Sequence, residues 1–270
     1  MAVKDVEGNP MVGQDSPVEV GRLETVQEML KRSKRTFLPL SHDFIQHPRG
    51  SVGRSSVLAK FMRAGDKRAL LAYLLILSAT SSSQNGIWFT SLSLQTWARA
   101  MGCFETATGK AAKVSASKIL KRLEDRNLID KQREGRSNVR VVLKSSDGTG
   151  AEYKRPKRRY VRLSYEFWER EYDQKLGMPA IAMLLVLLGE KPGCALPLER
   201  FPEWYGWSAD TAQRGLDQLS EMGIVEKLTR WERRPLSPEG VSKVSHYYLQ
   251  EPFDSNSVEL SKKRGSVKHG

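Results

Sequence analysis

The sequence predicts a mainly α fold with small β hairpins (α+β), built from two copies of one unit between disordered tails. The main observation is an internal repeat, because self-similarity constrains an architecture more than local propensity does. Three segments recur in the same order: 40–44 as 163–167, 69–77 as 179–187, and 120–131 as 216–227. The offset falls from 123 to 110 and then to 96. We therefore expect a duplication whose first copy has the longer connections.

Composition and charge narrow the class of partner. The chain has 270 residues, 39% of them hydrophobic, which is enough for one large core or two ordinary cores, and two are favoured. It carries 44 Lys and Arg against 31 Asp and Glu, a formal charge of +13. Such an excess indicates a partner with dense negative charge, nucleic acid first.

Three further observations concern location. The longest apolar runs end after about ten residues, well short of a membrane span. The N-terminal residues lack the basic and apolar regions of a secretion signal. Cys103 and Cys194 are far apart in sequence, which fits a reducing compartment and neither a disulfide framework nor paired metal ligands. We expect a cytoplasmic protein associated with nucleoid or plasmid.

Composition shifts divide the chain into five parts. The expected parts are an N-terminal tail with a short helix (1–35), a first domain (36–144), a basic linker (145–159), a second domain (160–253) and a C-terminal tail (254–270). The tail helix spans about 22–34, with Leu23, Val26, Met29 and Leu30 on one face. Within the first domain, residues 46–65 form an insertion without acidic residues. A DNA-contacting arm, a dimerisation element and disorder are open alternatives for it.

Hydrophobic period and capping residues predict the elements of each copy. In the first copy they are a helix over 66–78, a short strand over 86–90, a helix over 91–102, a helix over 112–126, and strands 128–133 and 139–144. In the second copy they are helices over 179–188, 198–205 and 209–222, and strands 224–228 and 244–249. Asp66 can cap the first helix, and Asn127 suits the turn after the third. Helix, strand, helix, helix, hairpin is the order of the winged-helix unit.

The third helix of each copy divides into an apolar and a polar face, as a helix must if it packs on its own domain and also enters a groove. Lys118, for example, aligns with Arg214, and Arg122 with Gln218. These residue types can reach phosphates or base edges in a major groove. The candidate DNA-binding residues are Ser115, Lys118, Lys121 and Arg122 in the first copy, and Thr211, Arg214 and Gln218 in the second.

Further basic residues lie where a winged helix would contact the DNA backbone. They are Arg133, Arg136 and Arg140 on the first hairpin, Arg230, Arg233 and Arg234 on the second, and Lys154, Arg155, Lys157, Arg158 and Arg159 in the linker. The linker run suits a phosphate backbone or a minor groove, and a merely solvated linker is the alternative. Trp231 suits either backbone contact or a protein interface. The other five Trp residues follow the apolar pattern and are expected in or beside the core.

From Phe37 to about Leu249 the chain resembles bacterial tandem winged-helix DNA-binding proteins. The residues that carry the resemblance are the Leu-Ser-x-acid-Phe segments at 40–44 and 163–167 and the Leu-x-x-Leu third helices. Plasmid replication initiators and winged-helix transcriptional regulators share this plan. The resemblance implies sequence-specific binding of double-stranded DNA, with the two third helices in major grooves about 34 Å apart. It leaves a homodimer and the replication or transcription machinery as further partners.

A transcriptional regulator is the favoured role, because no additional motif demands replication. A replication initiator that binds origin repeats and a protein-interaction adaptor are the alternatives. Enzyme motifs fail: Gly109-Lys110 lacks the preceding glycine of a phosphate loop, and the four His are too scattered for a zinc site. Tyr247 and Tyr248 are expected to pack in a strand rather than act as nucleophiles. The sequence predicts a non-enzymatic protein with no cofactor and no metal.

Overall fold

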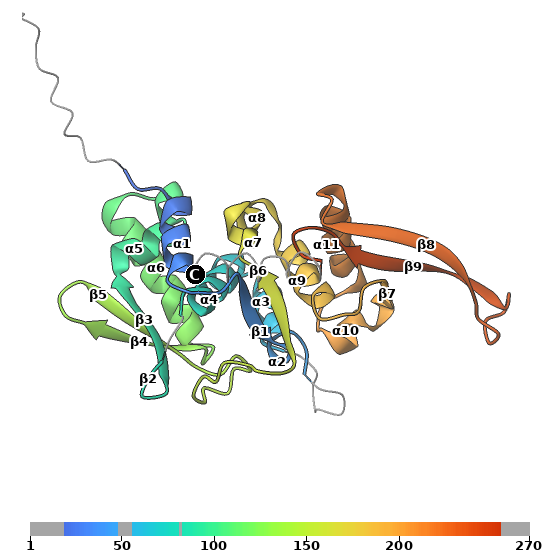
Figure 1. Ribbon diagram of the computed structural model, residues 1–270, viewed down its shortest axis with the longest axis horizontal. Coiled ribbons are helices and arrows are strands. Elements are labelled where there is room, and N and C mark those ends of the chain that lie inside the picture. Colours follow the sequence, from blue (N-terminus) through green and yellow to red (C-terminus); the bar gives the residue numbers. More distant parts are fainter. Residues whose placement is uncertain (1–18, 48–55, 81–82, 255–270) are drawn as a thin grey trace, which may run out of the picture.

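The structure is a computed structural model that describes residues 19–47, 56–80 and 83–254. It is an α+β structure with three small antiparallel sheets (Figure 1). Among the described residues, no helix combines the length and the apolar character needed to cross a membrane. Most of both expected tails, and residues 48–55 of the insertion, lie outside the described residues.

The first half of the chain contains the helix–strand–helix–helix–hairpin order expected from the sequence. Its elements are β1 (Phe37–Ser41), α2 (His42–Ile45), α3 (Val57–Ala64), α4 (Lys67–Ala79), β2 (Ser83–Gln84), β3 (Ile87–Ser93), α5 (Leu94–Ala100), η1 (Cys103–Glu105), α6 (Gly109–Glu124), β4 (Ile129–Glu134) and β5 (Asn138–Leu143). The strand order is β2-β3-β5-β4. Asp66 caps α4 by accepting a hydrogen bond from the Ala69 amide (3.3 Å). Ser93, and not Ser91, caps α5, because β3 continues to that residue.

The second half repeats this order. Its elements are β6 (Tyr160–Ser164), α7 (Glu166–Glu169), α8 (Tyr172–Lys175), α9 (Met178–Leu187), β7 (Cys194–Ala195), η2 (Leu198–Arg200), α10 (Phe201–Trp204), α11 (Ala209–Glu221), β8 (Val225–Arg233) and β9 (Val241–Leu249). The strand order β7-β9-β8 corresponds to β3-β5-β4 of the first half. The helix expected over 198–205 is a 3-10 turn followed by one short helix, with Pro202 in its first turn.

Strands β1 and β6, one from each half, pair with each other in a separate antiparallel sheet. The central pair, Pro39 with Arg162, joins two residues that the repeat aligns at offset 123. Leu38 pairs with Leu163, and the aligned residues Val161 and Leu40 also pair. The strand ends follow the same rule, since the amides at 42 and 165 donate to the carbonyls at 159 and 36 (3.0 and 2.9 Å). The junction is therefore symmetric with respect to the repeat.

The buried apolar side chains form one continuous cluster across both halves, and not the two cores favoured by the composition. The β1–β6 pairing and the contact of α3 with α9 bring the halves together. The described part of the expected insertion also belongs to this core, because α3 buries Val57, Leu58, Ala59 and Phe61. This part of the insertion is a packed helix, so the disorder interpretation is wrong for it, whereas DNA contact through its exposed Lys60 and Arg63 stays a prediction, as does dimerisation.

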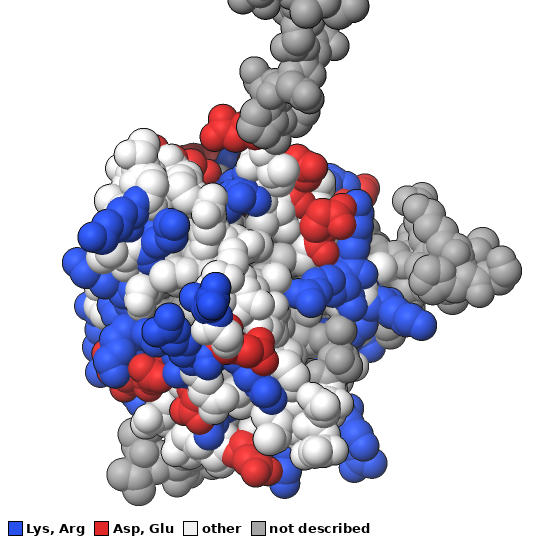
Figure 2. All heavy atoms as spheres, turned by 90° about the vertical axis from the view of Figure 1, so that its left-hand side faces the viewer, with Lys and Arg blue, Asp and Glu red and all other residues white. Residues whose placement is uncertain are grey.

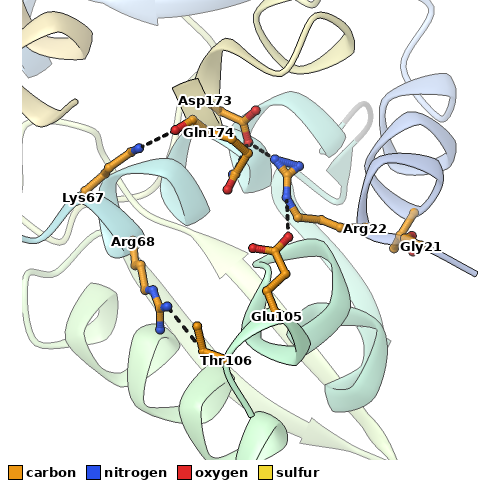
Figure 3. A network of polar contacts seen from close by, with 9 residues as sticks. Gly21, Arg22, Lys67, Arg68, Glu105, Thr106, Asp173 and Gln174 are labelled. Atoms are coloured by element: carbon orange, nitrogen blue, oxygen red, sulfur yellow. Dashed lines mark hydrogen bonds and ion pairs between the residues drawn. The ribbon is translucent and has the colours of Figure 1, made fainter. Parts of the chain in front are cut away.

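Helix α1 (Arg22–Lys31) packs against elements of both halves. It buries Val26, Met29 and Leu30, as its amphipathic pattern predicts, and packs against α4, α5 and α7. Figure 3 shows the Arg22 guanidinium between Asp173 of α8 and Glu105 of η1, which is 3.5 Å away. Arg22 is only 8% exposed, and burial raises the pKa of Asp173 although Arg22 offsets part of this effect. Loss of the Arg22 charge would leave the buried Asp173 carboxylate without its ion-pair partner.

Candidate nucleic-acid interface

The exposed face of α6 is basic with one apolar residue at its centre. Lys110, Val114, Lys118 and Lys121 recur at a spacing of three to four residues and are all exposed. In total, α6 has five basic residues and one acidic residue. Lys121 pairs with Asp125 at 3.0 Å, whereas Lys118 makes no ion pair with any residue in the described part of the chain. Lys and Arg side chains gather at this end of the molecule, with fewer acidic side chains between them (Figure 2).

Two candidates on α6 differ from the outward placement expected for them. Ser115 is half-buried and forms a hydrogen bond with Cys103, which offsets part of the rise that burial causes in the pKa of that thiol. Arg122 donates two hydrogen bonds to Asp66, the N-cap of α4, at 2.8 and 3.0 Å. Arg126 joins the same carboxylate at 3.0 Å. Burial alone would raise the pKa of Asp66, but Arg122 and Arg126 hold it below its ordinary value.

Gln218 on α11 makes contacts in the second half that correspond to those of Arg122 in the first. Its side-chain oxygen accepts a hydrogen bond from Gly177, the N-cap of α9, at 3.0 Å, and its amide donates to the Lys175 carbonyl at 3.3 Å. Gln218 and Arg122 are aligned in the repeat. Each bonds to the N-cap residue of the helix that opens the helix–strand–helix–helix–hairpin unit, which is α9 for Gln218 and α4 for Arg122. Their polar groups thus make contacts within the chain, although the Arg122 side chain is still 40% exposed, and DNA contact by either residue stays a prediction.

The exposed face of α11 has the opposite charge. Asp210, Arg214, Asp217 and Glu221 follow the same spacing and are all exposed. Arg214 is 64% exposed but pairs with Asp210 at 3.1 Å. The third candidate on this helix, Thr211, is half-buried, and its hydroxyl oxygen lies 2.9 Å from that of the N-cap residue Ser208. With three acidic residues and one basic residue, α11 repels the phosphates that α6 would attract.

The first hairpin contributes two exposed cations beside α6. Arg133 and Arg136 flank the turn at Gly135, where φ is +62° and glycine is favoured. Arg140 differs, because its guanidinium carbon lies 3.6 Å from the centre of the Phe89 ring and its Nη1 is 4.0 Å from Glu134. Arg140 therefore packs on the sheet, whereas the other two cations are turned toward solvent.

The expected linker packs along the first half instead of spanning open solvent. Tyr153 is buried against Trp88, and Arg155 lies over the same indole (4.0 Å) while donating to the Thr80 carbonyl (3.0 Å). Burial and nearby Arg35 lower the pKa of Arg155. Arg159 lies 3.7 Å from Asp43. Of the five linker candidates, Lys154, Lys157 and Arg158 remain as exposed cations for which the structure shows no anchoring contact within the described residues.

On the second hairpin, Arg230 and Arg233 are exposed, and Arg234 pairs with Glu232 at 3.0 Å. Trp231 is 70% exposed, the one Trp that the sequence did not assign to the core. The other five pack in the core or against it, as expected, and Tyr247 is buried. Sequence analysis missed Lys110 because it began the third helix at residue 112, and it missed Val114, which lies inside the predicted helix, because it looked for polar side chains on the outer face. Counting back from Lys118 in steps of four would have found Val114 and Lys110.

Comparisons with known protein families, with curated proteins and with solved structures found no match. Within the described residues, no group of three His, Cys, Asp or Glu is placed to hold a metal ion. The interface must therefore be interpreted from its own geometry and charge.

Proposed function

We propose that the chain is a sequence-specific, double-stranded DNA-binding protein made of two winged-helix units that arose by duplication. The matching strand orders of the two halves support the duplication. So does the turn after each third helix, where the aligned residues Asn127 and Gly223 have φ of +58° and +67°. The paired roles of Arg122 and Gln218 add a third, independent correspondence.

The exposed face of α6 carries the proposal. A helix fits the major groove, where Lys110, Lys118 and Lys121 would contact phosphates or guanine edges and Val114 a thymine methyl group. Arg133 and Arg136, on the adjoining hairpin, are placed to contact the backbone beside that groove. Base recognition in this proposal comes from the first half, because the acidic face of α11 opposes insertion of a second helix.

The biological role that we propose is transcriptional regulation. A regulator would protect one operator near its own or a neighbouring promoter, and footprinting on DNA that flanks the gene tests this. Protection of an array of repeats would instead favour a replication initiator, and no protection together with no duplex affinity would favour a protein-interaction adaptor.

The binding itself can be tested without knowing the operator. Duplexes enriched from a randomised 30-base-pair pool would be titrated with the full chain between about 50 and 200 mM salt. We expect affinity to fall by roughly 10³-fold or more over that range, because several cations displace counterions from phosphates. The Lys118→Ala variant should bind about tenfold more weakly, and the control Lys191→Ala, which removes an exposed charge elsewhere, within twofold of wild type. A shallow salt response, or no enrichment, would overturn the proposal.

A further inference from the structure

The second hairpin is longer and more regular than the first. Strands β8 and β9 pair over nine consecutive positions, from Val225 with Leu249 to Arg233 with Val241, without a bulge. The first hairpin has six such pairs. Figure 1 shows the β8–β9 ribbon extending beyond the helices of the second half. Its outer part therefore stands away from the body of the protein.

Because side chains alternate along a strand and paired residues share a face, the register assigns each side chain to one of two faces. One of them, called here the Trp231 face, consists beyond the core of Lys227, Thr229, Trp231 and Arg233 from β8 and Val241, Lys243 and Ser245 from β9. It contains three cations and an exposed indole but no acidic residue. Both acidic residues of β8, Glu226 and Glu232, lie on the opposite face.

On the opposite face, Arg230 is exposed, whereas His246 and Glu232 make contacts within the chain. His246 bridges the Gly193 carbonyl and Glu232, at 2.8 Å to each. Arg234 pairs with the same Glu232. These contacts connect the ribbon to the loop before β7, and they neutralise part of the charge on the opposite face of the ribbon. The Trp231 face makes few such contacts in its outer part, where Trp231, Arg233, Val241 and Lys243 are all exposed.

The inner end of the Trp231 face packs beside α11. Val225 and Tyr247, which lie on this face, are buried. Burial and then the nearby Asp217 carboxylate of α11 raise the pKa of the Tyr247 hydroxyl. The face thus begins next to α11 and continues outward past the acidic residues of that helix.

We infer that the Trp231 face is a second contact surface for duplex DNA, so that the second half binds through its hairpin and not through α11. Lys227, Arg233 and Lys243 would pair with phosphates, and the Trp231 indole would lie against sugars and base edges. The occupant follows from charge complementarity, since a surface with three cations and no acid matches a polyanion. A two-stranded ribbon also has dimensions that a DNA groove admits. This inference rests on the proposed DNA-binding function.

The sequence predicts that Arg230 and Arg233 both contact the DNA backbone, but the register places them on opposite faces and only Arg233 on the Trp231 face. They provide a matched pair for the test, because both are exposed arginines of β8. The enriched duplex would be titrated at several salt concentrations. We expect Arg233→Ala to weaken binding about fivefold to tenfold and to reduce the salt slope by about one, with Arg230→Ala within twofold of wild type. Trp231→Ala should weaken binding about tenfold with an unchanged salt slope, because the indole contact is apolar.

The outcomes separate this inference from the proposed function. If wild-type protein binds no duplex, the proposed function fails. If wild type binds but Arg233→Ala and Arg230→Ala lose equally, or Trp231→Ala loses nothing, the hairpin inference alone is overturned and a protein partner becomes the better occupant. Hydroxyl-radical footprints give a second reading: Arg233→Ala should lose protection at one edge of the footprint only, while the protection due to α6 remains. Circular dichroism melts would show that the three variants fold.

Discussion

Helices α6 and α11 align with each other in the internal repeat, and they have matching inner faces but oppositely charged outer faces. Inward, Ala116, Leu120 and Leu123 correspond to Ala212, Leu216 and Leu219, and all are buried. Outward, the aligned positions have diverged, with a valine replaced by aspartate (114 and 210) and a lysine by aspartate (121 and 217). Packing constrains the inner face in both halves, whereas the outer face can change its partner without cost to the fold.

The two halves also differ in the residue that connects α6 with α4 and in the aligned residue that connects α11 with α9. Arg122 forms a partly buried charged network with Asp66 and Arg126, whereas Gln218 makes two hydrogen bonds with backbone groups. Charge-assisted hydrogen bonds are the stronger kind, and replacing the partly buried Asp66 carboxylate is costly because two arginines lose the anion that they share.

The largest expected effect therefore comes from Asp66. Its side chain is 10% exposed and accepts from Arg122, Arg126 and the Ala69 amide. Asp66→Ala should lower the free energy of unfolding by about 3 kcal/mol. Gln218→Ala, which removes the corresponding neutral contacts, should lower it by about 1 kcal/mol. Chemical denaturation of both variants measures this, and equal losses would contradict the distinction between the halves.

The pH dependence of stability sharpens the same comparison. The pKa of Asp66 in the folded chain lies below its ordinary value of 3.8, so the ionised carboxylate stabilises the fold. That contribution is complete well above pH 3.8 and disappears as the pH falls through the folded pKa. The difference in unfolding free energy between wild type and Asp66→Asn should thus be constant from pH 7 to 5 and shrink below about pH 4. A difference that stayed constant down to pH 2 would show that the charge of Asp66 contributes nothing.

A smaller effect is expected from making α11 resemble α6. Asp217→Lys places on α11 the residue type found at the aligned position 121. It removes a repulsion from phosphates and adds a cation near the Trp231 face, so duplex affinity should rise about threefold to tenfold, more at low salt. Unchanged affinity across the salt series would indicate that DNA does not approach α11. Asp210→Lys, about two turns earlier on the same face, shows how far along the helix the DNA extends.

Sequence reasoning succeeded where the determinants are local. The order of the elements, the Asp66 cap and the left-handed turn at Asn127 all follow from short-range patterns and are present in the structure. It failed where the partner is distant in sequence. Arg122 bonds to Asp66 and Arg155 packs on Trp88, and in both cases a residue that looked free is held by a side chain more than fifty residues away. The continuous core has the same cause, because the β1–β6 pairing is a long-range contact.

The central claim is that α6 contacts DNA and α11 does not, and one matched pair tests it directly. Lys118 and Arg214 occupy aligned positions on the two helices, and both side chains are exposed, but only Arg214 is paired with a neighbouring carboxylate, that of Asp210. Duplex affinity of Lys118→Ala and Arg214→Ala would be measured over a salt series with the same enriched DNA. We predict that Lys118→Ala weakens binding about tenfold and lowers the salt slope by about one, while Arg214→Ala stays within twofold of wild type. Equal losses from the two substitutions, or a larger loss from Arg214→Ala, would contradict the account.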